Sequence, residues 1–393
     1  MIVIFLNNKL MSCDTVIPYM VEFSKRNPKR EILFVTFEFN TYKNIRKNET
    51  IYSDIIRIGK LISLQRDASS QGYLYFVART VFILLYITFR ALFFKTVFIH
   101  FKALREKYFY FYYLINKKRT FFFESEPLTM NEVTARFHRQ TGRHNKKNTK
   151  RVSAEYYDGT SNTWAGAKIA KEFNKELILV PPFKSTKFWN NHVRELSSLY
   201  FSDSSQFYED EYVITYILGS VSDGDSYMIN SKVGSYAFLI ETLDALNKNT
   251  NDIKICIKPH YITDMTILKK VLSKYDSNKF IITNVSLSLL AVKSFFFIAN
   301  YSTSAFVDPY FFNVPTIEYT LYSEKLDKLT KGKPLGNYTD FFIKHDRSML
   351  AKTIKEIIMY KNNKNLDHGV LRHKTNELLS EQRIDYLVRK MSI

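Results

Sequence analysis

Short apolar runs rich in β-branched and aromatic residues alternate along this chain with longer segments of helical periodicity. This alternation is typical of βαβ units, and it restricts the fold to parallel sheets covered by helices. In the first half, strands are predicted at residues 2–6, 32–37, 120–123 and 177–180. Helices are predicted over residues 16–26, with Asp14 as N-cap, and over residues 164–173, with Asn162 as N-cap.

A polar stretch at residues 202–205 interrupts this pattern, and a second alternation follows it. Strands are predicted there at residues 212–218, 253–257, 280–282, 295–299 and 316–318, and amphipathic helices at residues 346–362 and 375–391. A length of 393 residues also suits more than one domain. We therefore predict an α/β chain of two doubly wound Rossmann-like domains facing a cleft. Its parts are an N-terminal domain (1–201), a linker (202–210), a C-terminal domain (211–345) and C-terminal helices (346–393) that cross back onto the N-terminal domain.

Charge is the strongest deviation in the composition, because 57 Lys and Arg face 38 Asp and Glu for a net charge of +19. Such a surface attracts nucleic acid, an anionic membrane or acidic substrates and nucleotides, unless it is merely a solvated Lys-rich surface. No nucleic-acid-binding motif is recognisable, so no nucleic-acid partner is expected. Cys13 and Cys256 form neither a disulfide framework nor a zinc-ligand spacing, which favours a reducing cytoplasm. The apolar run at residues 2–6 is too short for a signal peptide.

The stretch of residues 73–101 is the one place where a membrane span has to be considered. Arg79, Arg90 and Lys95 interrupt it and leave an uncharged run at residues 80–89. A spanning helix needs roughly 20 apolar residues, so none is predicted. A buried core helix is favoured. A helix lying against the inner face of the cytoplasmic membrane is the alternative, since basic and aromatic residues follow this stretch.

A histidine and a cluster of hydroxyls follow two predicted strands of the second domain. Lys258-Pro259-His260 ends one strand and presents an imidazole with an ordinary pKa of ~6.5, which can assist a phosphate leaving group or simply cap the next helix. Residues Ser302, Thr303 and Ser304 precede a helix predicted near Phe306, where hydroxyls and free N–H groups suit an anion. Plain N-capping by one of them is the alternative.

An aspartate occupies the corresponding position in the first domain. Asp158 precedes Gly159 in a predicted turn before a helix, where a carboxylate can accept the proton of an attacking hydroxyl. An Asx turn is the alternative, and Glu155 is a reserve candidate for the base.

Two further loops have a composition that suits anions. A basic run that includes Arg139, Arg143, Lys146 and Lys147 would bind an anionic acceptor or surface, or be a solvated loop. The loop that starts at Gly219 and Ser220 would let the backbone approach a nucleotide closely, although it has neither the Walker nor the GxGxxG spacing. No acidic cluster at a strand end suggests a metal site, so no metal is expected.

In order and spacing, the three motifs at Asp158, His260 and residues 302–304 resemble those of bacterial GT-B sialyltransferases and polysialyltransferases. Those enzymes carry an acidic residue with Gly in the N-terminal domain, a His-Pro motif in the C-terminal domain and a later Ser/Thr pair. Here Tyr261 follows His260 where the family has Pro, and Tyr157 replaces the second acidic residue. Capsule Kdo transferases and polyol-phosphate transferases of capsule and teichoic-acid assembly are similar in the second domain.

The resemblance implies an inverting glycosyltransferase of surface polysaccharide or lipooligosaccharide biosynthesis. Its donor would be a CMP-activated acidic sugar, either a sialic-acid-like nonulosonate or Kdo, and its acceptor a glycan or glycolipid bound by the N-terminal domain. Asp158 would be the general base, and His260 would assist the departing phosphate. The expected donor-binding residues are Lys258, Pro259, Ser302, Thr303, Ser304, Gly219 and Ser220. No cofactor is expected; a CDP-polyol phosphotransferase and a basic nucleic-acid-binding protein are the alternatives.

Overall fold

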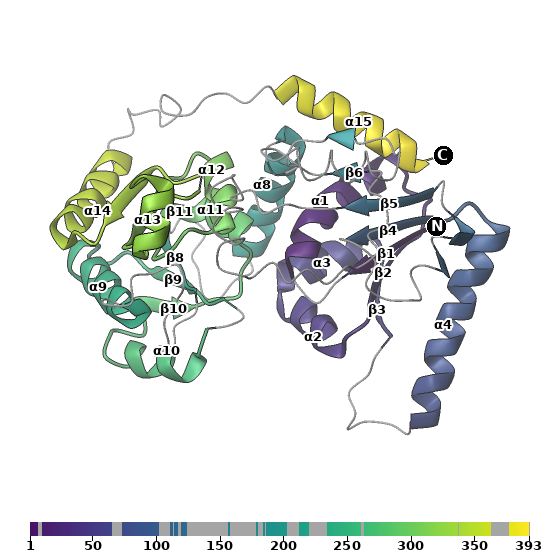
Figure 1. The fold of residues 1–393 in the computed structure, drawn as a ribbon, viewed down its shortest axis with the longest axis horizontal. Coiled ribbons are helices and arrows are strands. Elements are labelled where there is room, and N and C mark those ends of the chain that lie inside the picture. Colours follow the sequence, from purple (N-terminus) through teal and green to yellow (C-terminus); the bar gives the residue numbers. More distant parts are fainter. Residues whose placement is uncertain are drawn as a thin grey trace. The chain divides into compact units, whose positions relative to one another are not determined.

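The protein folds into two compact α/β units, each built on a parallel sheet (Figure 1). Unit 1 comprises Met1–Glu126, Asn145–Trp189 and Asn376–Ile393, and unit 2 comprises Pro127–His144 and Asn190–Thr375. The computed structural model describes residues 1–6, 10–64, 73–101, 111–112, 114–116, 119–123, 156–157, 178–179, 184, 186–202, 212–219, 234–260, 263–336, 338–362 and 377–392. The prediction of two parallel-sheet α/β domains is confirmed.

The sheet of unit 1 has the strand order β3-β2-β1-β4-β5, with every neighbouring pair parallel. Its inner strands are continuous apolar segments that are buried on both faces, as parallel sheets require. Two of its strands, β3 and β4, are absent from the sequence prediction. The strands are β1 (Ile2–Leu6), β2 (Ile32–Thr36), β3 (Lys60–Ser63), β4 (Val97–Phe101) and β5 (Thr120–Phe123), and a separate parallel pair joins β6 (Tyr156–Tyr157) to β7 (Ile178–Leu179).

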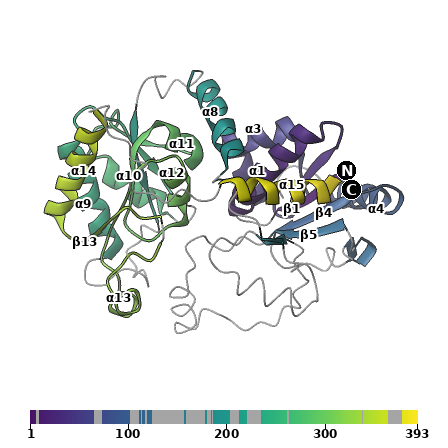
Figure 2. The same cartoon turned by 90° about the horizontal axis from the view of Figure 1, so that it is seen from above.

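The first and last helices of the chain lie together in unit 1 (Figure 2). Helix α1 (Leu10–Arg26) and helix α15 (Glu377–Ser392) are joined through Arg26, which pairs with Glu22 at 2.6 Å and also with Asp385. The prediction that Asp14 caps the first helix is wrong, because α1 begins at Leu10 and Asp14 lies inside it. The other helices near this sheet are α2 (Phe39–Lys47), α3 (Glu49–Ile58) and α4 (Tyr73–Phe93), and α8 (Lys187–Ser202) runs into unit 2.

The apolar stretch of residues 73–101 divides into α4 and β4, with the helix ending at Phe93. The Thr96 hydroxyl donates to the Arg90 carbonyl at 2.8 Å and satisfies one of the last helical acceptors. Only one face of α4 is covered by the sheet, so the prediction of a buried core helix is wrong for the opposite face. Within the described ranges, no helix combines the length and hydropathy that a membrane-spanning segment requires.

The sheet of unit 2 has the order β10-β9-β8-β11-β12-β13, again with all neighbouring pairs parallel. Helices α9 and α14 pack against each other beside it, and their apolar side chains share one core with the strands. Its strands are β8 (Val213–Ile217), β9 (Ile255–Lys258), β10 (Phe280–Ile282), β11 (Ser294–Ala299), β12 (Thr316–Thr320) and β13 (Phe341–Lys344). Its helices are α9 (Gly234–Asn249), α10 (Met265–Leu272), α11 (Leu287–Lys293), α12 (Val307–Phe311), α13 (Glu324–Thr330) and α14 (Arg347–Asn362).

A carboxyl group lies buried in the middle of β12. The side chain of Glu318 has no exposed surface; it accepts hydrogen bonds from the Tyr322 hydroxyl and, at 3.0 Å, from the Thr339 hydroxyl. Burial raises the pKa of Glu318 to about 7, although both hydrogen bonds act in the opposite direction. The folded protein therefore holds a proton on Glu318 at pH values where an unfolded chain has released it.

We predict that Glu318→Gln flattens the pH dependence of stability. Because the pKa of Glu318 is raised on folding, its contribution is most favourable below pH 4.5 and is lost as the pH rises towards 7. One pKa unit corresponds to ~1.4 kcal/mol. As the pH rises, the free energy of unfolding of the wild type should therefore fall by up to about 3 kcal/mol through this group, and the variant should show no such loss. Urea unfolding at pH 5 and pH 8 measures the difference. Glu324→Gln, at an exposed carboxyl of α13, is the matched control, and parallel pH profiles for wild type and Glu318→Gln would contradict the prediction.

Candidate functional site

The carboxyl edge of the unit 2 sheet brings together three of the predicted loops. In the register of the sheet, Lys258 of β9 lies level with Ile217 of β8, and Ile217 lies level with Ala299 of β11. The residues that follow these three positions therefore emerge at one edge. Strand β8 has β9 on one side and β11 on the other, which makes the β8/β11 boundary the switch point where open α/β sheets bind ligands.

Gly219 and Tyr301 face each other at this switch point. A Cβ atom added to Gly219 would lie 2.8 Å from Cε1 of Tyr301, so a side chain at this position would displace the ring. The Tyr301 hydroxyl donates to the Leu218 carbonyl at 3.0 Å and ties the end of β11 to the end of β8. Burial raises the pKa of Tyr301 to about 12, so this hydroxyl remains a donor well above neutral pH.

His260 is exposed and follows β9, as the sequence predicts. Its backbone N–H donates to Oγ1 of Thr263 at 2.9 Å, and the Thr263 hydroxyl donates to the Gly219 carbonyl at 2.7 Å. Thr263 therefore links the loop after β9 to the loop after β8. Lys258 is half-buried, and its ammonium donates to the Asn284 carbonyl at 2.8 Å, which fixes it beside the end of β10.

The side chain of Asn300 fixes the end of β11 by hydrogen bonds. Its buried side chain donates to Oγ1 of Thr242 at 2.8 Å and to the Tyr319 carbonyl at 3.0 Å, and it accepts from the Tyr216 hydroxyl. One amide thus joins β8, α9, β11 and β12 directly beneath the switch point. With these partners the position of Tyr301 and the hydroxyl cluster is set by buried hydrogen bonds.

The hydroxyl cluster lies in the loop that follows Tyr301. Ser302 and Thr303 are half-buried and Ser304 is exposed. Thr303 accepts a hydrogen bond from the Ala305 N–H at 3.1 Å and is therefore an N-cap, which leaves the two serine hydroxyls unassigned by capping. The helix predicted near Phe306 starts as a 3₁₀ turn over Ser304–Phe306 and continues as α12, which has five residues.

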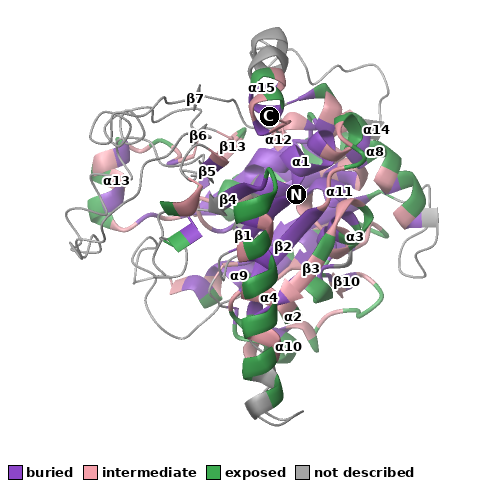
Figure 3. Ribbon diagram, turned by 90° about the vertical axis from the view of Figure 1, so that its right-hand side faces the viewer, coloured by how far each residue is buried: buried purple, intermediate pink, exposed green. Residues whose placement is uncertain are grey.

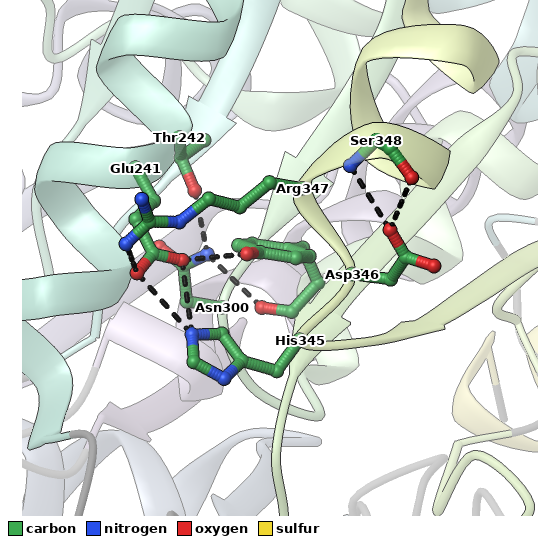
Figure 4. A network of polar contacts seen from close by, with 8 residues as sticks. Glu241, Thr242, Asn300, His345, Asp346, Arg347 and Ser348 are labelled. Carbon is green, nitrogen blue, oxygen red and sulfur yellow. Dashed lines mark hydrogen bonds and ion pairs between the residues drawn. The ribbon is translucent and has the colours of Figure 1, made fainter.

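A second polar network lies beside this edge and connects α9, β12 and α14 (Figure 4). Glu241 accepts hydrogen bonds from the Tyr319 hydroxyl at 2.6 Å and from the Arg347 guanidinium, and His345 lies 3.1 Å away. Burial alone would raise the pKa of Glu241, but the hydrogen bonds from Arg347, Tyr319 and His345 outweigh it and lower the pKa. The carboxylate stays charged and satisfied, so this network supports the sheet.

The remaining predicted site residues lie outside the described residues. They are Asp158, Ser220, Arg139, Arg143, Lys146 and Lys147. Tyr157, which precedes Asp158, lies in β6. Among the residues that the structure describes, no cluster of three or more His, Cys, Asp or Glu side chains is arranged as a metal site.

Sequence reasoning missed Thr263 and Asn300, the two residues that position the site. Thr263 lies three residues after His260, a spacing at which a hydroxyl often bonds the backbone of a turn. Asn300 directly follows the apolar strand, where a polar residue is indistinguishable from an ordinary loop residue. Its role depends on Tyr216, Thr242 and Tyr319, which are distant in sequence.

The fold resembles that of several solved enzyme structures, whereas no protein-family model and no curated protein sequence matches the chain. A UDP-GlcNAc 2-epimerase from Neisseria meningitidis bound to UDP-GlcNAc is 11% identical, with a TM-score of 0.53 and all of both chains covered. The wall teichoic acid polymerase TagF is 15% identical, with a TM-score of 0.53 over 99% of this chain and 89% of its own. A TagF variant soaked with CDPG is 16% identical, with a TM-score of 0.51 over 99% of this chain and 88% of its own. These identities show the fold alone, which is a GT-B-like fold of two Rossmann-like units.

Proposed function

We propose that this protein is an inverting glycosyltransferase of bacterial surface polysaccharide or lipooligosaccharide assembly. It would transfer a nonulosonate or Kdo from a CMP-activated donor to a hydroxyl of a glycan or glycolipid. One observation carries the proposal: a glycine, an imidazole and two serine hydroxyls emerge from three loops at the switch point of the unit 2 sheet, and Thr263 and Tyr301 bond these loops to one another.

The donor phosphate would occupy this edge of the sheet. Ser302 and Ser304 would donate hydrogen bonds to its oxygens, and Gly219 would allow the nucleotide to approach the backbone. His260 would donate a proton or hydrogen bond to the phosphate oxygen as the bond from the sugar to CMP breaks. These donors would stabilise the leaving group without requiring a divalent ion.

The acceptor hydroxyl would react with the bound donor. Its oxygen would attack the anomeric carbon while the bond to the CMP phosphate breaks, which inverts the configuration. Asp158 would take the hydroxyl proton as general base, and the basic residues Arg139, Arg143, Lys146 and Lys147 would bind an acidic acceptor. These roles rest on the motif resemblance alone. Asp158 and the four basic residues lie outside the described ranges.

A CDP-polyol phosphotransferase is the second candidate. The likeness of fold to TagF, including a structure soaked with CDPG, favours it, since the same phosphate-binding edge could hold a cytidine diphosphate. The two reactions differ in the bond that breaks. A phosphotransferase releases CMP from CDP-glycerol and transfers the polyol phosphate, whereas a glycosyltransferase releases CMP from a CMP-sugar.

We predict that cytidine nucleotides stabilise the folded protein. A ligand at one hundred times its Kd stabilises the native state by about 2.7 kcal/mol, which raises Tm. A thermal-shift series with CMP, CDP, UDP and GDP measures this effect. Shifts with UDP or GDP but not with CMP or CDP would overturn the cytidine donor, and would instead support a nucleotide-sugar enzyme of another class.

We predict that Ser302→Ala and Ser304→Ala each weaken CMP binding. A hydrogen bond to a charged group contributes roughly 1.5–3 kcal/mol, so each variant should raise the Kd about tenfold or more. Ser273→Ala is the matched control, because its hydroxyl bonds the Lys270 carbonyl at the end of α10. Isothermal titration measures the Kd of CMP for each variant. Equal Kd values for all three variants would show that the two serine hydroxyls do not bind CMP.

We predict that His260→Ala lowers kcat by about 10²–10⁴-fold while CMP binding changes much less. Asp158→Asn should abolish transfer and leave the nucleotide Kd nearly unchanged. Thr263→Val retains the imidazole but removes the hydroxyl that joins His260 to Gly219. Its kcat should therefore fall less than that of His260→Ala. Release of CMP from CMP-sialic acid, CMP-Kdo and CDP-glycerol provides the assay. Full activity of His260→Ala on every donor would contradict its catalytic role.

A further inference from the structure

Helix α4 (Tyr73–Phe93) is apolar on two opposite faces, and only one of them is covered. Ile87 and Ala91 are buried, and Ile83 and Leu84 partly so, against the core of unit 1 that includes Phe5 and Phe98. A helix that is apolar all round is normally buried on all sides. In Figure 3 exposed residues instead run along the length of α4.

The uncovered side is an unbroken apolar surface. We call the set Val81, Phe82, Leu85, Phe89, Leu92 and Phe93 the outer face of α4. Phe82 is 71% exposed and Phe93 is 69% exposed. The ring of Phe89 lies 4.9 Å from that of Phe93, so the aromatic groups form a cluster on the surface. Single exposed apolar side chains need no explanation, but a contiguous patch of this kind marks an interaction surface.

The charged residues of the α4 segment itself are all basic. No Asp or Glu occurs between residues 73 and 101, whereas Arg79, Arg90 and Lys95 lie on or directly after the helix. The described contacts bring one carboxylate to α4, that of Glu31, which lies 4.0 Å from Arg90 and 3.9 Å from Lys60. Basic residues beside an aromatic and aliphatic face complement an anionic surface with an apolar interior.

We propose that the outer face of α4 docks the protein on an anionic lipid surface, with the helix lying in the plane of the headgroups. The opposite face is part of the unit 1 core, so α4 cannot leave the sheet to cross a bilayer without exposing that core. Its 21 residues correspond to a rod of about 30 Å, along which the exposed aromatic side chains enter the boundary of the acyl chains.

A second copy of the chain fits this surface less well. A two-fold interface places the same patch of each copy against its counterpart. Arg79 and Lys95 of one copy would then approach the same residues of the other, with no acidic residue in the segment to neutralise them. Anionic lipid headgroups supply that neutralisation.

The test is vesicle co-sedimentation of the full chain with vesicles of phosphatidylcholine, with and without phosphatidylglycerol. The wild type should sediment with the anionic vesicles, and Phe82→Gln/Leu85→Gln should bind them at least about tenfold more weakly. Met349→Gln/Met359→Gln is the matched control: it makes the same polar change at two exposed side chains of α14 and should bind like the wild type. Equal Tm values for the three proteins establish that folding is unchanged.

A second pair of substitutions tests how much positive charge contributes to vesicle binding. Arg79→Gln/Lys95→Gln should abolish the preference for phosphatidylglycerol, and salt should weaken wild-type binding because the Debye length falls from about 10 Å at 0.1 M to about 3 Å at 1 M. Wild-type and α4-variant binding of equal strength would overturn the proposal. A wild-type dimer that dissociates in Phe82→Gln/Leu85→Gln, without vesicle binding, would also overturn it and assign the outer face to a second copy. This test is independent of the proposed donor, because it measures no transfer.

Discussion

The arrangement of unit 2 depends on a single buried amide, the side chain of Asn300. It lies where the strand order reverses, and its three hydrogen bonds join two neighbouring strands and a helix to the end of β11. A buried amide of this kind destabilises the fold if any partner is lost, because the orphaned group is not resolvated. The loops that carry Gly219, His260 and the two serines therefore extend from a rigid edge, which reduces the conformational entropy that a ligand would have to remove.

The two glutamates of these polar clusters show how hydrogen-bond partners set the charge of similar carboxyl groups. Glu241 is surrounded by donors, one of them a guanidinium, and its pKa is lowered. Glu318, the residue before Tyr319 in β12, has only hydroxyl donors, and its pKa is raised to about 7. Of the two, only Glu241 has a guanidinium and an imidazole among its partners, and both of these lower its pKa. One therefore acts as a fixed charge at the edge of the sheet and the other as an uncharged core group in acid.

Much of this architecture is predictable from sequence, because strands buried on both faces are continuous apolar runs. The short apolar runs of β1, β2, β8 and β11, which alternate with helical segments, therefore predict buried strands. The edge strands β3 and β13 are partly exposed and lack that signal, and β4 merges with the apolar helix before it. The positions of His260 and Ser302–Ser304 after strands were equally readable. The hydrogen bonds that link them were not, since Thr242, Tyr216 and Tyr319 converge on Asn300 only after folding.

The place of α15 has a consequence for how the protein is made. Unit 1 consists of Met1–Glu126, Asn145–Trp189 and Asn376–Ile393, and Arg26 of α1 bonds to Asp385 of α15. A ribosome releases residues 377–392 only after all of unit 2, so the first unit to begin synthesis is the last to be completed. Until then the surface of α1 that α15 covers stays exposed on the nascent chain. The core of unit 2 is formed by residues that precede α15 in the sequence, so it can form before α15 of unit 1 has been synthesised.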